Sequence, residues 1–228
     1  LLYGSYQKPR ELLWIFGMVI YFALMAEAFF GYLLPWGNMS YWGAQVIVSL
    51  FGAVPVVGDS LMEWIRGDYY ISDITLNRFF ALHVIALPLV LVFLVIAHLM
   101  ALHEVGSNNP DGVEIKKVKG PDGIPLDGIA FHPYYTVKDL VGVGVFLIIF
   151  CLIIFFAPTM GGYFLESANF EPANALQTPP HIAPVWYFTP FYAILRSVPN
   201  KPMGAALMGL AVVLFVFLPW LDRSKVKS

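Results

Sequence analysis

The chain has 228 residues, of which 59% are apolar and only 12% are charged, and its mean hydropathy is +0.72. A water-soluble domain is nearer half apolar and a quarter charged, so this composition indicates a protein whose solvent is lipid. The net charge is −2, and no basic cluster points to nucleic acid as a partner. The single cysteine excludes an intrachain disulfide.

Four apolar runs are long enough to cross a hydrocarbon core of about 30 Å, which takes about 20 helical residues. We place them at about 12–34, 79–102, 140–157 and 204–221. The stretch 42–65 contains proline and glycine and is expected to form a hairpin of short interfacial helices. The proline- and aromatic-rich stretch 179–199 is expected to be a folded loop with a short surface helix. The sequence therefore predicts an all-α, polytopic transmembrane bundle.

This pattern divides the chain into three parts. Residues 1–105 hold two spans and the hairpin, 106–139 form a loop, and 140–228 hold two spans and the aromatic loop. With this topology, nine lysines and arginines lie on the side of the two chain ends and the loop, and four lie on the other side. The positive-inside rule makes the first side cytoplasmic. The hairpin and the aromatic loop then share the outer side, where they can enclose a pocket.

His83 and His98 lie near opposite ends of the second predicted span. Ionisable side chains inside a spanning helix are costly and are functional candidates. Their separation of fifteen residues is about 22 Å along the axis and about 60° around it, so both can face one bundle interior. Imidazole is a common haem ligand, and two haems at these levels would let electrons cross most of the membrane. The alternative is a pair of buried histidines hydrogen-bonded to neighbouring helices.

Gly17 and Gly31 on the first span match the histidine separation. They are 14 residues apart, or about 21 Å along a helix. Without a side chain, each would let the edge of a flat macrocycle approach the backbone, although small residues also serve close helix packing. Arg78 lies just over one turn before His83, where it can pair with a haem propionate or extend to the membrane surface.

Several longer strings resemble one family, cytochrome b, the haem- and quinone-binding subunit of respiratory ubiquinol–cytochrome c reductase. GYLLPWGNMSYWGA resembles the end of the family's third helix, and RFFALH resembles the start of its fourth. HLMALH followed by GSNNP resembles the end of that fourth helix, and PVWY followed by PFYAILRS resembles the outer quinol motif. These strings occupy residues 31–44, 78–83, 98–103, 106–110, 184–187 and 190–197.

The resemblance implies that the chain is a fragment covering about helices three to six of an eight-helix protein. It implies two b haems, each taking one axial histidine from this chain and the other from a preceding helix, so the fragment alone should neither hold haem stably nor turn over. The family reaction is quinol oxidation on the outer side. One electron goes to a Rieske iron–sulfur protein and a cytochrome c-type subunit, and the other crosses to reduce quinone on the cytoplasmic side, coupled to proton translocation. The resemblance also implies a homodimeric complex in a bacterial inner membrane.

The resemblance also assigns residues. For the outer quinol pocket it suggests Tyr32, Gly43, Ile47, Pro184, Val185, Trp186, Tyr187 and Tyr192. For the inner quinone site it suggests His103, Ser107, Asn109, Lys138 and Asp139. A quinone headgroup needs an apolar aromatic slot and a few groups that exchange protons, and both sets supply these. Lys138 and Asp139 are also compatible with an ordinary interfacial ion pair.

Two departures from the family pattern matter. Val185 stands where the usual motif has a glutamate, and Glu27 lies inside the first span one turn before Gly31. We expect Glu27 to take over proton transfer from the quinol, the alternative being a structural glutamate held protonated. The histidine spacing is fifteen where mitochondrial members have fourteen. Pro88 removes a backbone hydrogen bond, so a local bulge is expected to absorb the extra residue.

Two rival classes remain. One is a haem-free transporter or channel whose membrane histidines relay protons, and the other is a non-catalytic assembly subunit. A split bis-histidine absorption band in the intact protein would exclude the first. Sensitivity to quinone-site inhibitors would exclude the second.

Overall fold

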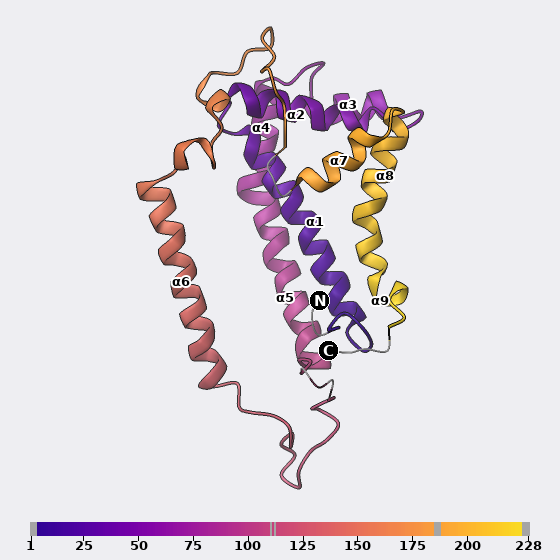
Figure 1. Cartoon of the computed structure of the whole chain (residues 1–228), viewed down its shortest axis with the longest axis vertical. Helices are drawn as coiled ribbons and strands as arrows, with labels where there is room; N and C mark the ends of the chain where they lie inside the picture. Colours follow the sequence, from indigo (N-terminus) through magenta and orange to yellow (C-terminus); the bar gives the residue numbers. More distant parts are fainter. Residues whose placement is uncertain (1–3, 110, 112, 185–187, 225–228) are drawn as a thin grey trace. The chain divides into compact units, whose positions relative to one another are not determined.

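A computed structural model describes residues 4–109, 111, 113–184 and 188–224 of the chain (Figure 1). In these ranges every regular element is a helix, and β pairing is limited to two isolated bridges. Four helices are long and apolar enough to cross a membrane. The predicted all-α fold with four spans and short interfacial helices is therefore confirmed.

The four spans are built from six α-helices and two helical turns of other types. The first span is α1 (Glu11–Leu33), and the second joins α4 (Asp73–Ala81), the π-helix η1 (Leu82–Ala86) and α5 (Leu87–Val105). The third is α6 (Tyr134–Phe156), and the fourth joins α8 (Lys201–Val213), the 3-10 helix η5 (Leu214–Phe217) and α9 (Leu218–Leu221).

The remaining helices connect these spans. The predicted hairpin is α2 (Asn38–Phe51) and α3 (Gly58–Arg66), and the helix predicted in the aromatic loop is α7 (Thr189–Ser197). Two 3-10 turns, η2 (Met160–Gly162) and η3 (Ser167–Phe170), follow α6. The predicted positions are correct, but α2 begins four residues before the predicted hairpin and α6 begins six residues before the predicted span.

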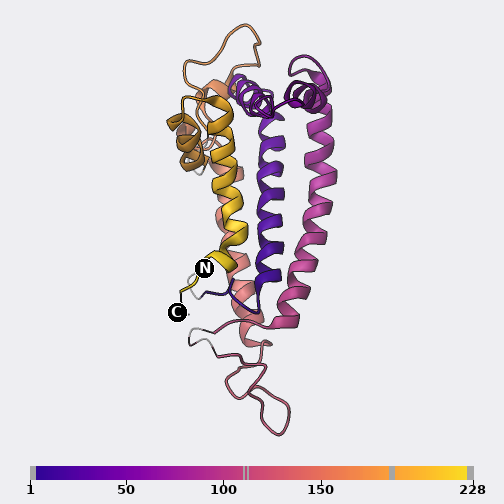
Figure 2. The ribbon, with the colours of Figure 1, turned by 90° about the vertical axis from the view of Figure 1, so that its right-hand side faces the viewer.

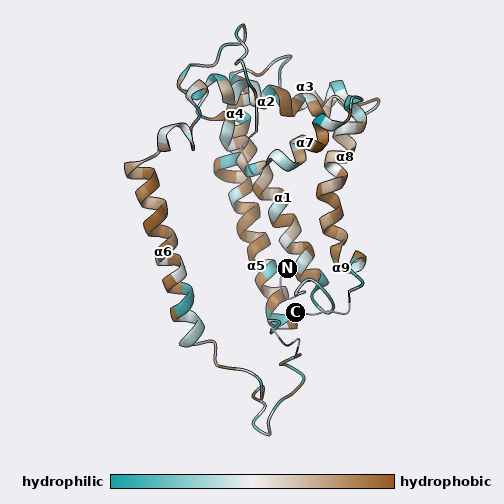
Figure 3. Cartoon of the chain, in the orientation of Figure 1, coloured by the Kyte–Doolittle hydropathy of each residue, from teal (hydrophilic) through white to brown (hydrophobic). Residues whose placement is uncertain are grey.

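The chain forms two compact units. One contains Ser5–Val105 together with Ala168–Lys225, and the other contains Gly106–Ser167. In the first unit α1 and α5 run side by side along most of their length, as both views show (Figures 1 and 2). In the second unit α6 is apolar along most of its length, whereas its first turns, which include Lys138 and Asp139, are hydrophilic (Figure 3).

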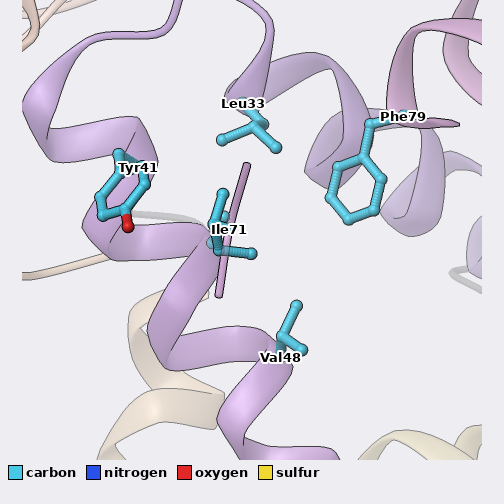
Figure 4. Packing of buried hydrophobic residues seen from close by; sticks show 6 residues of the cluster. Leu33, Tyr41, Val48, Ile71 and Phe79 are labelled. Carbon is cyan, nitrogen blue, oxygen red and sulfur yellow. The ribbon is translucent and has the colours of Figure 1, made fainter. Parts of the chain in front are cut away.

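The core of the first unit lies where α1 meets α2 and α4 (Figure 4). Phe79 is 1% exposed and packs edge-on against Phe29 and Phe30, with ring centroids 5.3 and 4.6 Å away. Aromatic pairs in this arrangement add about 0.5–1.5 kcal/mol beyond the area they bury. The buried cluster consists of Leu33, Tyr41, Ala44, Val48, Ile71 and Phe79.

The second span contains the bulge that the sequence predicts. The Leu87 N–H donates to the Leu82 carbonyl, five residues back, and this π-helical turn ends two residues before Pro88. A π turn takes up one residue more than an α turn. His83 and His98 are therefore related by about the rotation of fourteen ordinary helical residues, which keeps both on one face.

Candidate functional site

At one end of the α1–α5 pair, His83 lies directly against Gly31. A Cβ atom added to Gly31 would lie 2.8 Å from His83 Nδ1 and 3.0 Å from His83 Nε2. Real Cβ atoms almost never approach a neighbour that closely, so only glycine leaves room for the imidazole here.

At the other end His98 lies against Gly17 in the same way but less tightly. A Cβ on Gly17 would lie 3.3 Å from His98 Cε1 and 3.8 Å from His98 Nδ1. The antiparallel helices therefore pair each predicted ligand with a predicted glycine, at two levels of the span. We name these the Gly31–His83 level and the Gly17–His98 level.

Glu27, one turn before Gly31, contacts the imidazole of the first level. The His83 Nδ1 atom lies 2.9 Å from the Glu27 backbone oxygen and 3.0 Å from Glu27 Oε1. A backbone carbonyl can only accept, so Nδ1 carries a hydrogen, and in the neutral imidazole Nε2 then keeps its lone pair. Haem iron binds an imidazole through such a lone pair.

The arrangement at both levels fits a haem ligand. At the Gly31–His83 level the tautomer leaves Nε2 as the free base, and at the Gly17–His98 level the buried Nδ1 has no hydrogen-bond partner in the described part of the chain. Groups of three or more His, Cys, Asp or Glu residues that could hold a metal ion by themselves do not occur among the described residues. One imidazole per level is consistent with a macrocycle that takes its other ligand from elsewhere.

Arg78 has a different partner from the one predicted. Its Nη1 donates to the Trp64 carbonyl over 2.7 Å, and its guanidinium lies against Gly67, whose φ of +76° suits glycine. This contact ties α4 to the end of α3. A guanidinium has five N–H donors, so pairing with a propionate stays a prediction.

Among the residues predicted for the outer pocket, Tyr32 and Gly43 are in contact. Tyr32 lies against Gly43, where a Cβ would be 3.2 Å from the tyrosine ring, and Ile47 is 38% exposed. In α7 the Arg196 guanidinium lies 6.0 Å from the centroid of the Tyr192 ring. Pro184 lies in the loop before α7. The remaining predicted residues, Val185, Trp186 and Tyr187, lie outside the described residues.

Asn38 attaches a distant segment to the start of α2, and no motif near Asn38 predicts this contact. Its backbone N–H donates to the Glu171 carbonyl over 2.8 Å. Its side chain donates to the Gln177 carbonyl over 2.9 Å and accepts from the Asn174 N–H over 3.0 Å. Asn38 itself is 3% exposed, whereas Glu171, Asn174 and Gln177 are exposed, so these bonds are shielded from water on the Asn38 side only.

Asn169 completes this attachment. Its Oδ1 accepts from the Ser40 backbone N–H over 2.8 Å, and its backbone lies so close to Gly37 that a Cβ there would overlap it. The Trp36 backbone carbonyl accepts from the Ala173 N–H over 3.0 Å. We call the segment 169–177 docked on residues 36–42 the outer clamp. It holds the beginning of the loop that carries Pro184.

The residues predicted for the inner site belong to both units. His103 is in α5 of the first unit, whereas Ser107, Asn109, Lys138 and Asp139 are in the second unit. Within that unit Asn109 Nδ2 donates to Asp127 Oδ2 over 2.8 Å, and Lys138 Nζ lies 5.9 Å from the centroid of the Tyr135 ring. The grouping of these residues into one quinone site stays a prediction.

A polar contact joins the beginning of the first unit to its end. The Tyr6 hydroxyl donates to Asp222 Oδ2 over 2.6 Å, and Gln7 Nε2 donates to the same oxygen over 3.1 Å. The Tyr6 hydrogen bond is the main cause of a lowered Asp222 pKa, and the same bond raises the Tyr6 pKa. The start of α1 and the end of α9 therefore share a side, as the predicted topology requires.

Comparison with known proteins decides the family. A family model described as cytochrome b(N-terminal)/b6/petB matches residues 1–190, and one described as cytochrome b(C-terminal)/b6/petD matches residues 172–228. The chain belongs to the cytochrome b family. This confirms the resemblance that the motifs indicate.

Individual cytochrome b proteins cover the whole chain. Cytochrome b of Allochromatium vinosum is 65% identical over 100% of this chain and 57% of its own length. That of Rickettsia prowazekii is 54% identical over 100% of this chain and 54% of its own length. A solved chain of a hyperthermophilic respiratory Complex III superimposes with a TM-score of 0.86 at 41% identity, covering 99% of this chain and 58% of that one. The chain thus spans about half the length of the curated relatives it matches.

Proposed function

We propose that this chain is part of a respiratory quinol–cytochrome c oxidoreductase, in which it oxidises quinol at the outer side and reduces quinone at the cytoplasmic side of a bacterial inner membrane. The observation that carries the proposal is the pairing of Gly31 with His83 and of Gly17 with His98 in a chain of the cytochrome b family. Membership of the cytochrome b family favours this reading over a haem-free proton relay, which would use the same close histidine–glycine contacts.

His83 and His98 would hold one b haem each, and the second axial ligand would come from a segment outside this chain. When bound, the two haems supply one-electron transfer between the two faces of the membrane. Gly31 and Gly17 let each imidazole approach α1 closely, and the Glu27 carbonyl accepts from His83 Nδ1, which leaves Nε2 free in the neutral ring. Arg78, which lies near His83 in sequence, would add a donor for a propionate.

The outer pocket would bind the quinol between α2 and the loop before α7. Tyr32, Gly43 and Ile47 would contribute one wall, and Pro184 through Tyr187 with Tyr192 the other. The outer clamp supports this proposal, since it ties the beginning of that loop to α2. The Glu27 carboxylate contacts His83 Nδ1. The expected exchange of a quinol proton with Glu27 stays a prediction.

On the cytoplasmic side His103, Ser107, Asn109, Lys138 and Asp139 would bind the quinone and supply protons to it. A Rieske iron–sulfur protein and a cytochrome c-type subunit would accept the outer electron in a homodimeric complex. The two ends of the first unit and the loop after α5 would face the cytoplasm.

Replacing each histidine by leucine in the intact complex tests the proposal. We expect His83→Leu and His98→Leu each to remove one of two haem components from the absorption spectrum. As a matched control, His132→Leu should retain both components, since His132 lies outside the spans and bonds only locally to Thr136. A complex whose haem content is unchanged by both span variants would contradict the proposal.

A further inference from the structure

The two histidine levels differ in what faces the Nδ1 atom of each imidazole. At the Gly31–His83 level two oxygens of one residue surround it, the Glu27 carbonyl at 2.9 Å and Glu27 Oε1 at 3.0 Å. At the Gly17–His98 level, Nδ1 is buried and has no hydrogen-bond partner within the described ranges.

The difference follows from the sequence of α1. Glu27 precedes Gly31 by four residues, and the residue that precedes Gly17 by four is Leu13. Residues four apart lie on one face of a helix, so Glu27 lies on the face of Gly31 and Leu13 on the face of Gly17. The Glu27 side chain carries a carboxylate, whereas the Leu13 side chain is a hydrocarbon.

The Glu27 side chain is held against His83 rather than solvated. It is 18% exposed, and its second oxygen, Oε2, is buried without a hydrogen-bond partner among the residues described. A carboxylate placed in a membrane span is costly, and here its one recorded side-chain contact is His83 Nδ1. That contact is therefore the main stabilising interaction visible for the group.

We propose that Glu27 is a positioning residue for the His83 haem. Its carboxylate makes His83 a stronger electron donor to the iron, and this lowers the reduction potential of that haem below the value that the Glu27 backbone carbonyl alone would produce. This inference rests on the proposed function, since it requires His83 to be a ligand. The His83 Nδ1–H donates to the Glu27 carbonyl, and the Glu27 carboxylate, 3.0 Å from the same nitrogen, adds an electrostatic interaction that orients a ligating imidazole and raises its basicity. A more basic ligand favours the oxidised iron, and so does a nearby negative charge.

The test is a redox titration of both haems in the intact complex, followed by absorption. In Glu27→Leu the ratio of oxidised to reduced His83 haem at a fixed potential should fall about tenfold, an upward shift of about 59 mV for one electron. Glu27→Gln keeps an acceptor oxygen of similar shape without the charge, so its shift should have the same sign and be smaller. The His98 haem provides an internal reference and should not move in either variant.

Glu11→Gln is the matched control. It removes the same charge from the same helix, but at the first residue of α1, far along the chain from Gly31. It should leave the His83 haem potential unchanged. The inference is overturned if both haems stay bound and the His83 haem keeps its potential in Glu27→Leu, or if both haems shift equally. A wild-type complex that lacks haem would instead overturn the proposed function.

Discussion

The two ends of the α1–α5 pair carry the same pair of residues and are built very differently. Around the Gly31–His83 level, the chain supplies a buried cluster, a hairpin, the outer clamp and a carboxylate on the imidazole. Around the Gly17–His98 level it supplies Trp14, which donates to the Phe215 carbonyl, and the contact between Tyr6 and Asp222. One end is formed largely by this chain, whereas the other relies on a few polar contacts.

This difference predicts that the Gly17–His98 level tolerates added side-chain volume better than the Gly31–His83 level. A site enclosed by packed side chains responds strongly to added volume, because its neighbours have nowhere to move. A site with looser contacts can adjust. The glycine geometry is consistent with this, since the space beside Gly31 is tighter than that beside Gly17.

The largest effect is expected from adding one methyl group at the Gly31–His83 level, where the contact is closer. Gly31→Ala would place its Cβ 2.8 Å from His83 Nδ1, which forces the imidazole away from α1. We expect the complex to lose most of its His83 haem component, measured by absorption on purified complex. Gly17→Ala meets His98 at 3.3 Å and should keep most of its haem. Equal losses in the two variants would show that the levels do not differ in this way.

A smaller effect is expected from the outer clamp. Asn38→Ala removes the side-chain partners of the Asn174 N–H and the Gln177 carbonyl, two part-buried bonds, at a cost of about 1 kcal/mol. The complex should melt at a lower temperature and bind outer-site quinol inhibitors more weakly. Ser49→Ala, in the same helix, loses only an exposed local bond to the Val46 carbonyl and should melt like the wild type. If the two variants behave alike, the clamp does not support the outer pocket.

The smallest effect is expected at the other end, from Tyr6→Phe. The lowered Asp222 pKa means that its contribution to stability exists above the ordinary carboxyl pKa of 3.8 and is lost as pH falls through the lowered value. The raised Tyr6 pKa means that its contribution exists below 10.0 and is lost as pH rises through the raised value. The variant should therefore melt slightly below the wild type near neutral pH. Melting curves should converge toward both extremes of pH, and a constant difference would argue against the contact.

Much of the fold and of the histidine–glycine arrangement was predictable because it depends on the periodicity of the helices. The four spans follow from apolar length, and the facing of Gly31 with His83 follows from spacing along two antiparallel helices. The bulge before Pro88 was also predictable, since proline cannot donate to the helix. The spans and the bulge are each encoded within about one helix length of sequence, and the histidine–glycine facing needs only the spacing within two neighbouring spans.

Other features depend on pairing between distant segments and leave no local signal. The outer clamp joins Asn38 to residues more than 130 positions later, and nothing near Asn38 identifies its partners. Glu27 was expected on the face of Gly31, but the direction of its carboxylate toward His83 depends on how α5 packs. Similarly, α6 begins at Tyr134, six residues before the predicted span. Its first turns contain polar residues, so a prediction based on the apolar run alone starts the helix too late.

The π turn at Leu82–Ala86 also bears on how this family changes length. Insertion of a single codon into a membrane helix would ordinarily rotate everything beyond it by about 100° and separate residues that must act together. Here the additional residue is confined to five positions, and His83 and His98 keep a common face. A π turn of this kind lets a span gain or lose one amino acid between two side chains whose facing must be kept, so the spacing of the histidines can change while their geometry is preserved.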